Sequence, residues 1–214
     1  MLMIIIEALK ETTLMLLISG IFTLVLGIPL GFLLYGTNHK NFFHNQLTHY
    51  LLQGPSSFIN SMPYLVVMVA CLPITKWLMA HGVSGSIAAV IPLTIAAVPL
   101  YGLLTYKAIC KLPSELSDTA KSLGATPWQA LFSMYLPEIL PNLIHGFTTT
   151  MESLIRYSTI SGIFGAGGLG FLLIQKGYYD FSLLYITICA LLLAVLFQTT
   201  RYIGILVTDY TIRN

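Results

Sequence analysis

Six stretches of the sequence contain no Asp, Glu, Lys or Arg, and they constrain the fold more than any other feature. They cover residues 12–39, 41–75, 77–106, 139–151, 157–175 and 181–200. A helix needs about 20 largely apolar residues to cross a bilayer, and several of these stretches are long enough. They show no period of two, which disfavours membrane-spanning strands. An all-α, polytopic membrane protein is therefore expected.

The composition excludes several other classes of protein. Hydrophobic residues make up 56% of the 214 residues and charged residues only 8%, whereas about 25% of the residues in soluble domains are charged. A formal net charge of +2 supplies no basic face, so no nucleic-acid partner is expected. The three cysteines and five histidines show no spacing typical of a metal site, so neither a metal nor a cofactor is expected.

Five transmembrane helices are expected within a single transmembrane domain over 1–214. The segment from Thr37 to Gln53 is too polar to lie in a bilayer, so the second span begins after it. The fourth span follows a long polar loop over 107–141. The expected spans lie near 12–36, 57–79, 84–106, 142–163 and 181–206.

The distribution of basic residues predicts the orientation of the chain. Five spans place the two termini on opposite sides of the membrane. With the N-terminus outside, the inner segments hold six Lys and Arg residues and the outer segments hold three. Because cytoplasmic segments carry an excess of basic residues, an outer N-terminus and a cytoplasmic C-terminus are predicted.

Glycine and proline occur inside the first expected span. Gly27 and Gly31 are separated by three residues, a spacing that lets two membrane helices approach closely. Pro29 lies between them, and membrane helices tolerate such a residue when neighbouring groups satisfy the freed carbonyl. Close packing of this segment against another helix is one possible role of the two glycines.

The loop over 107–141 has the pattern of a helix, a turn and a second helix. Gly124 suits a left-handed cap that ends the first helix. Thr126 and Gln129 form a capping-box pattern for the second helix, which Leu136-Pro137 is expected to end. The pattern alone leaves two interpretations: an interfacial amphipathic hairpin without a partner, or a docking element for a soluble protein.

Within this loop, Asp118-Thr119-Ala120 is followed after three residues by Gly124, and after nine more by Met134-Tyr135-Leu136-Pro137. This spacing resembles the EAA loop of ABC-importer permeases, although Asp118, Thr119 and Met134 replace Glu, Ala and Ile. The resemblance implies a cytoplasmic coupling loop that fits a groove on a separate ATP-hydrolysing subunit and transmits its movement. Its implied coupling residues are Asp118, Thr119, Ala120, Gly124, Leu136 and Pro137.

Further motifs narrow the resemblance. They are Leu123-Gly124-Ala125-Thr126-Pro127, Leu136-Pro137-Glu138-Ile139-Leu140-Pro141, Tyr157-Ser158 and the glycine-rich segment from Gly165 to Gly170. Together with the length of the chain, they are similar to the permease subunit of methionine-type ABC importers. The similarity extends over nearly the whole chain.

This resemblance implies a function and a set of partners. The permease would be a transport subunit rather than an enzyme, and would translocate D- or L-methionine and related amino-acid derivatives across the bacterial inner membrane by alternating access. It would form a homodimer, surrounded by lipid, with two cytoplasmic ABC ATPase subunits and an extracytoplasmic substrate-binding lipoprotein. The sequence has no Gly-x-x-x-x-Gly-Lys-Ser/Thr motif, so ATP would be bound by the partner ATPase.

The segment from Gly165 to Gly170 formally matches the Gly-x-Gly-x-x-Gly pattern of dinucleotide-binding loops. Such a site would need a preceding strand and an acidic residue about 20 positions further on. Here an apolar membrane helix precedes the segment, and Asp180 follows too closely. A flexible turn at the outer end of the fourth span is the better interpretation, because glycine permits close backbone approach.

Glu152 and Arg156 are charged residues inside the expected fourth span. They lie one helical turn apart and suit an ion pair. Each charge costs about 2.5–3.5 kcal/mol at mid-membrane on insertion scales, so both should face protein or a watery path. Two interpretations stay open: a self-satisfied structural pair, or a contact for a zwitterionic amino acid in transit. Methionine-type permeases usually have an uncharged residue and Gly here.

Three more residues of the fourth span are candidates for the solute pathway or its gate. The resemblance aligns Ile160 with the outer gate of the family, and an apolar constriction blocks solutes by dewetting. Tyr157 and Ser158 belong to the motif that carries this alignment. A lipid-facing or core position is the alternative for Ile160.

Three other functions compete with methionine import. An ABC permease for another small amino acid is the nearest of them. A self-contained ion-coupled secondary transporter would explain the intramembrane charges but not the EAA-like loop. A membrane scaffold without transport activity would explain the apolarity and the docking loop, but it would require neither the charge pair nor the glycine-rich turn.

Overall fold

The computed structural model describes residues 2–37, 46–113, 116, 122, 124 and 126–213. Within these residues it contains helices and no strand, which confirms the all-α prediction. Three helices are long and apolar enough to cross a membrane, and counting each of two bent helix pairs as one span gives five. The number of spans agrees with the prediction from the charge-free stretches.

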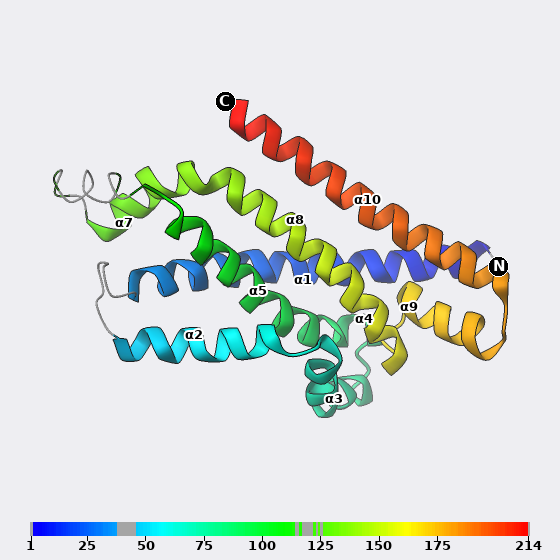
Figure 1. The fold of residues 1–214 in the computed structure, drawn as a ribbon. Coiled ribbons are helices and arrows are strands. Elements are labelled where there is room, and N and C mark those ends of the chain that lie inside the picture. The colour runs from blue at the N-terminus through cyan, green and yellow to red at the C-terminus, as the bar shows by residue number, and fades with distance from the viewer. Residues whose placement is uncertain are drawn as a thin grey trace.

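The spans run back and forth between two ends of the bundle (Figure 1). One end carries α7 (Pro127–Ala130) and is called the α7 end; the opposite end carries α9 (Gly168–Leu172) and is called the α9 end. The N-terminus lies at the α9 end, where the last helix also begins. The remaining helices are α1 (Leu2–Thr37), α2 (Gln46–Ser61), α3 (Tyr64–Ala80), α4 (Gly85–Ala88), α5 (Val90–Cys110), α8 (Leu136–Ser161) and α10 (Leu183–Arg213).

The second span consists of two helices, so the expectation of one helix over 57–79 is wrong. α2 and α3 meet at an angle of 105°. Pro63 stands at the bend with φ −57° and ψ 135°; it has no N–H to donate, and it disfavours helical geometry in the residue before it. α2 packs along α5, whereas α3 turns across the bundle and is seen nearly end-on in Figure 1.

The second helix of the loop continues directly into the fourth span, so the prediction that Leu136-Pro137 ends it is wrong. α7 passes through a π-helical turn, η1 (Leu131–Tyr135), into α8. The N–H of Leu136 donates to the carbonyl of Leu131, five residues back. This wider turn shifts the hydrogen-bond register just before Pro137, which has no N–H to donate, and the helix therefore continues.

The first, third and fifth spans are found where the sequence predicts them, but they are longer. α1 begins at Leu2 rather than near residue 12, α4 and α5 together reach Cys110, and α10 extends to Arg213. Charged residues near the ends of these helices do not stop them, because their side chains can extend toward the polar interface.

The glycine-rich segment forms a turn, as expected, and a short helix that the sequence did not predict follows it. Gly165, Gly167 and Gly168 have positive φ angles, which glycine adopts without steric cost. α9 and the π-helical segment η3 (Leu173–Tyr179) then leave the turn at 48° to the preceding helix. These residues are too few to cross a bilayer, so length and hydropathy could not separate them from the fourth span.

The N-terminal helix holds the start of α9 in place. The Glu11 carboxylate accepts a hydrogen bond of 2.6 Å from the N–H of Gly168, and the Thr12 hydroxyl accepts one of 2.8 Å from the N–H of Leu169. Both N–H groups belong to the first turn of a helix, which has no carbonyl partners of its own. A Cβ atom at Gly168 would lie 2.6 Å from the Thr12 Oγ1 atom, so glycine is needed for this close contact.

Glycines also bring α1 and α5 into close contact. A Cβ atom at Gly27 would lie 2.7 Å from Cδ1 of Tyr101, and one at Gly31 would lie 2.8 Å from the carbonyl oxygen of Gly102. A Cβ atom at Gly102 would in turn lie 2.7 Å from Leu30. The close packing considered for the Gly27–Gly31 spacing is therefore confirmed, with α5 as the partner helix.

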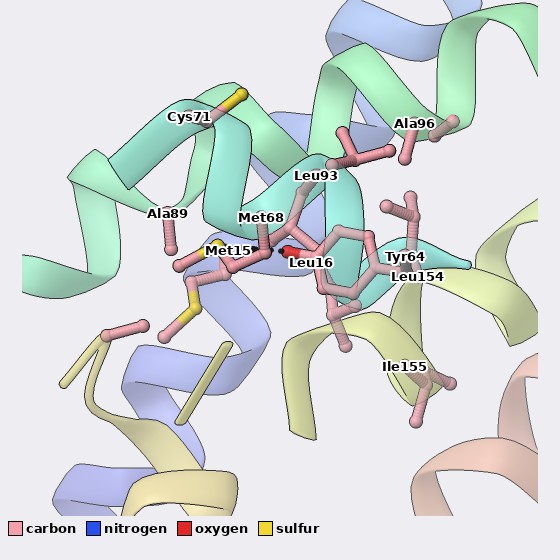
Figure 2. Packing of buried hydrophobic residues seen from close by; sticks show 13 residues of the cluster. Met15, Leu16, Tyr64, Met68, Cys71, Ala89, Leu93, Ala96, Leu154 and Ile155 are labelled. Carbon is pink, nitrogen blue, oxygen red and sulfur yellow. Dashed lines mark hydrogen bonds between the residues drawn. The ribbon is translucent and has the colours of Figure 1, made fainter. Parts of the chain in front are cut away.

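A buried cluster joins four helices toward the α9 end. Met15 and Leu16 of α1 meet Tyr64 and Met68 of α3, together with residues of α5 and α8 (Figure 2). The bend at Pro63 positions α3 for this contact, because it turns Tyr64 into the bundle. The α5 and α8 members labelled in Figure 2 are Leu93, Ala96, Leu154 and Ile155.

Replacement of Gly31 by alanine is expected to weaken the contact between α1 and α5. The added methyl group would collide with Thr105 and with backbone of α5, so we expect a loss of about 1–3 kcal/mol in the free energy of unfolding. Gly54→Ala is the matched control, because a Cβ atom there has no neighbour within 4 Å. The free energy of unfolding of both variants can be measured in mixed micelles. Equal values for Gly31→Ala and Gly54→Ala would contradict the packing role of Gly31.

Replacement of Glu11 by alanine is expected to loosen the start of α9. Loss of a capping side chain costs about 1–2 kcal/mol, and backbone amides of the 165–172 segment should exchange hydrogen faster. Glu11→Gln keeps an acceptor oxygen and should show a smaller effect. Glu7→Ala, at an exposed position one turn earlier, is the control. Hydrogen exchange followed by mass spectrometry gives the comparison; unchanged exchange in Glu11→Ala would refute the capping role.

Candidate functional site

The predicted coupling segment, residues 107–141, shows among its described residues the turn geometry that its sequence predicts. Gly124 has a φ of 65°, the left-handed conformation expected of a helix cap. The backbone N–H of Thr126 donates to Oε1 of Gln129 at 2.9 Å, and the backbone N–H of Gln129 donates to Oγ1 of Thr126 at 3.3 Å. These two bonds are the reciprocal pair of a capping box, which fixes the start of α7.

The other predicted coupling residues lie in different surroundings. Asp118, Thr119 and Ala120 fall outside the residues that the structure describes. Leu136 is half-buried and Pro137 is exposed, both in the first turn of α8. The structure therefore brings Gly124, the capping box and Leu136-Pro137 to the α7 end.

A second buried cluster anchors this end of α8 to the rest of the bundle. Tyr135 and Ile139 are buried against Ala108 and Ile109 of α5. Tyr135 also meets Tyr35 of α1 edge to face, with ring centroids 6.0 Å apart. The part of the predicted coupling segment that leads into α8 thus packs directly against the ends of α1 and α5.

The candidate gate residues lie near the α9 end of α8. Tyr157 stacks on Tyr64 of α3 at 4.4 Å between ring centroids, with 12° between the planes. Ile160 is half-buried and packs at the edge of the cluster shown in Figure 2. Ser158 is buried and donates a hydrogen bond to the carbonyl of Ile155. In the single chain, Tyr157 and Ile160 lie at the edge of the core, whereas Ser158 points into it.

Tyr64 is a residue of this region that sequence reasoning missed. Its hydroxyl and Oγ of Ser161 are 2.5 Å apart and share a hydrogen bond, so α3 is held to α8 by this bond as well as by the Tyr157 stack. No local pattern signals a contact between residues 97 positions apart. The one hint is Pro63, which precedes Tyr64 and can turn the chain.

Glu152 and Arg156 do not form the expected ion pair, although both belong to the described residues. The ion pair that the structure records is Lys176–Asp180, at 2.8 Å. The guanidinium carbon of Arg156 lies 5.7 Å from the ring centroid of Phe197 on α10, a cation–π contact. The interpretation of a self-satisfied pair is therefore wrong for this structure, and the contact of Glu152 and Arg156 with a solute stays a prediction.

The described residues hold no cluster of three or more His, Cys, Asp or Glu side chains able to bind a metal. One continuous helix joins the capping box at the α7 end to the Tyr157 stack and the glycine-rich turn at the α9 end. The predicted coupling residues and the candidate gate residues therefore lie toward opposite ends of the same helix.

Sequence comparisons agree with this arrangement. Residues 27–205 match the family of binding-protein-dependent transport system inner membrane components. The probable D-methionine transport system permease protein MetI of Vibrio cholerae is 35% identical over 194 residues, which cover 91% of this chain and 86% of that protein. The Escherichia coli K12 D-methionine transport system permease protein MetI is 30% identical over 162 residues, covering 76% of this chain and 74% of that protein.

A solved structure resembles the fold over nearly its full length. A chain in the native crystal form of the inward-facing MetNI methionine ABC transporter superposes with a TM-score of 0.94 and 29% identity. The match covers 99% of this chain and 97% of that one. The chain is therefore a multi-pass inner-membrane permease, and it belongs to the family of binding-protein-dependent transport system inner membrane components.

Proposed function

We propose that this permease imports methionine, in D or L form, together with related amino-acid derivatives. The observation that carries the proposal is the likeness to a chain of the MetNI methionine ABC transporter over 99% of the sequence. Relatives at 30–36% identity that are named D-methionine permeases support the same substrate. A permease for another small amino acid is the second candidate, because Glu152 and Arg156 differ from the usual residues of the methionine type.

Two copies of the chain would form the transport pathway. The described residues of one chain form at most five spans, which are few to enclose a solute, and a two-fold homodimer is the commonest closed arrangement. Two cytoplasmic ABC ATPase subunits would bind the α7 end, with Asp118, Thr119, Ala120, Gly124, Leu136 and Pro137 as the coupling residues. An extracytoplasmic binding lipoprotein would deliver the solute at the α9 end.

The proposed assembly implies an orientation for the chain. If the coupling segment binds a cytoplasmic ATPase, the α7 end is cytoplasmic and the α9 end is outside. The N-terminus lies at the α9 end (Figure 1), so it would be outside, and after five spans the C-terminus would be cytoplasmic. The excess of Lys and Arg in the same segments supports this orientation independently.

Movement of the ATPase subunits would switch the pathway between inward and outward access. ATP binding would bring the two ATPases together and move the two coupling segments. Because α7, η1 and α8 form one helix, the movement would reach Tyr157, Ser158 and Ile160, the candidate gate. The glycine-rich turn beyond this helix would permit the change of angle there.

Reconstitution in proteoliposomes tests the proposal. The chain would be combined with an ABC ATPase and a binding protein from the same organism, and ATP-dependent uptake of labelled L- and D-methionine would be compared with uptake of other small amino acids. Uptake of methionine is expected only when ATP and ATPase are present. Transport of a different amino acid would favour the second candidate, and uptake by the chain alone along an ion gradient would refute the ABC mechanism.

Replacement of Gly124 by valine is expected to uncouple transport from ATP hydrolysis. The left-handed φ of 65° is strained for a β-branched residue, so the turn before the capping box should deform. We expect ATP-driven uptake to fall by about tenfold or more, equivalent to roughly 1.4 kcal/mol in the coupled step.

Gly82→Val is the matched control for this variant. Gly82 has a φ of 85°, and like Gly124 it has no neighbour within 4 Å of a built Cβ atom, but it follows α3 at the α9 end. Both substitutions strain the backbone, yet only the one in the coupling segment should impair uptake. Equal uptake by the two variants, at equal protein levels, would contradict the coupling role.

A further inference from the structure

One face of α8 is polar although it is not covered by the rest of the chain. Its residues recur at helical spacing of three or four: Asn142, His145, Thr149, Glu152 and Arg156. Asn142, His145 and Arg156 are exposed, and Thr149 and Glu152 are half-buried. These five residues are called the α8 polar stripe, and they follow the length of the expected fourth span.

The uncovered faces of α1 and of the first half of α10 are mostly apolar, although Lys76 of α3 and Arg201 of α10 are also exposed. On α1 the exposed residues include Leu17, Ile21 and Val25, and on α10 they include Leu191 and Val195. Apolar faces of this kind suit lipid. Charged side chains are costly in lipid and are found where a helix faces protein or a water-filled path. The α8 polar stripe therefore does not face lipid in the assembled protein.

The two charges of the stripe keep their binding capacity. Lys176 and Asp180 have the same four-residue spacing and form an ion pair at 2.8 Å, whereas Glu152 and Arg156 do not pair in the described structure. The guanidinium carbon of Arg156 lies 5.7 Å from the ring centroid of Phe197, a cation–π contact, and a guanidinium in such a contact can still donate hydrogen bonds from its N–H groups. One anionic and one cationic group are thus available one helical turn apart.

We propose that Glu152 and Arg156 form the solute-selecting site of the pathway, with Glu152 binding the ammonium and Arg156 the carboxylate of a zwitterionic α-amino acid. This inference rests on the proposed import function and deepens it. Side chains one turn apart have Cβ atoms about 5–6 Å from each other, so both can reach the two charges carried on one α-carbon. Arginine matches a carboxylate with two parallel hydrogen bonds.

Charge complementarity favours this occupant over other solutes. A cation would meet Arg156 and an anion would meet Glu152, each with a repulsive contact, whereas a zwitterion satisfies both groups. The stripe as a whole adds no net charge when His145 is neutral. The site therefore selects for paired opposite charges rather than for the side chain of the amino acid.

Binding of solutes to the complex of the chain with its ATPase, in nanodiscs and without the binding protein, tests the site. The probes are methionine, its methyl ester, which lacks the carboxylate, and 4-(methylthio)butanoate, which lacks the ammonium. The unsubstituted complex should bind methionine about tenfold more tightly than either analogue, a difference of roughly 1.4 kcal/mol.

Single substitutions should remove this preference selectively. Glu152→Gln should abolish the preference over the butanoate but keep the preference over the ester, and Arg156→Gln should do the reverse. The double variant Glu152→Leu/Arg156→Gly should bind all three probes alike. Arg201→Gln, which removes an exposed charge from α10, is the control and should keep both preferences.

Three results would overturn the inference. One is the absence of saturable methionine binding to the unsubstituted complex, and another is an equal effect of each substitution on all probes. The third is an ion pair between Glu152 of one copy and Arg156 of the other. It would be revealed if single substitutions dissociate the homodimer and if exchanging the two residues restores the homodimer. Failure of the import proposal is distinguishable, because it would appear as absent ATP-driven methionine uptake by the unsubstituted chain.

Discussion

A bilayer offers no water to satisfy backbone hydrogen bonds, and three interruptions of helices among the described residues meet that constraint. At the bend between α2 and α3, Pro63 has no N–H that would need a partner. In η1, the N–H of Leu136 finds the carbonyl of Leu131 instead of the usual one. At the start of α9, side chains of α1 accept the free N–H groups of Gly168 and Leu169. At each of these three places, either a specific hydrogen-bond acceptor or the absence of a backbone N–H lowers the free-energy cost of interrupting the helix.

Features that depend on neighbours along the chain could be predicted from the sequence. The lengths of the charge-free stretches were enough to predict helical spans, because the thickness of the bilayer sets how many apolar residues a spanning helix needs. The capping box of Thr126 and Gln129 and the left-handed Gly124 were likewise predictable, since their partners lie within one turn. The family resemblance added what no local pattern contains, namely the expectation that this segment docks on another subunit.

Features that depend on distant packing could not be predicted. Pro29 and Pro99 lie inside continuous helices, whereas Pro63 stands at a bend of 105°. Beyond this bend Tyr64 meets Ser161 of α8, 97 positions away, and local sequence contains no sign of that contact. The Glu11 contact joins residues 157 positions apart. Sequence spacing also failed to predict ion pairs: Lys176 and Asp180 form one, whereas Glu152 and Arg156, at the same spacing of four, do not.

The two buried clusters constrain how α8 can transmit movement. From Pro127 to Ser161 the chain is one helix, about 50 Å long at 1.5 Å per residue. Tyr135 and Ile139 hold one end to α5, and the Tyr157 stack holds the other to α3. A helix does not stretch appreciably, and close-packed clusters shift between discrete arrangements rather than deform continuously. In the proposed mechanism, a push on the coupling segment must therefore tilt or rotate α8, which would turn the α8 polar stripe and reposition Tyr157 in the same step.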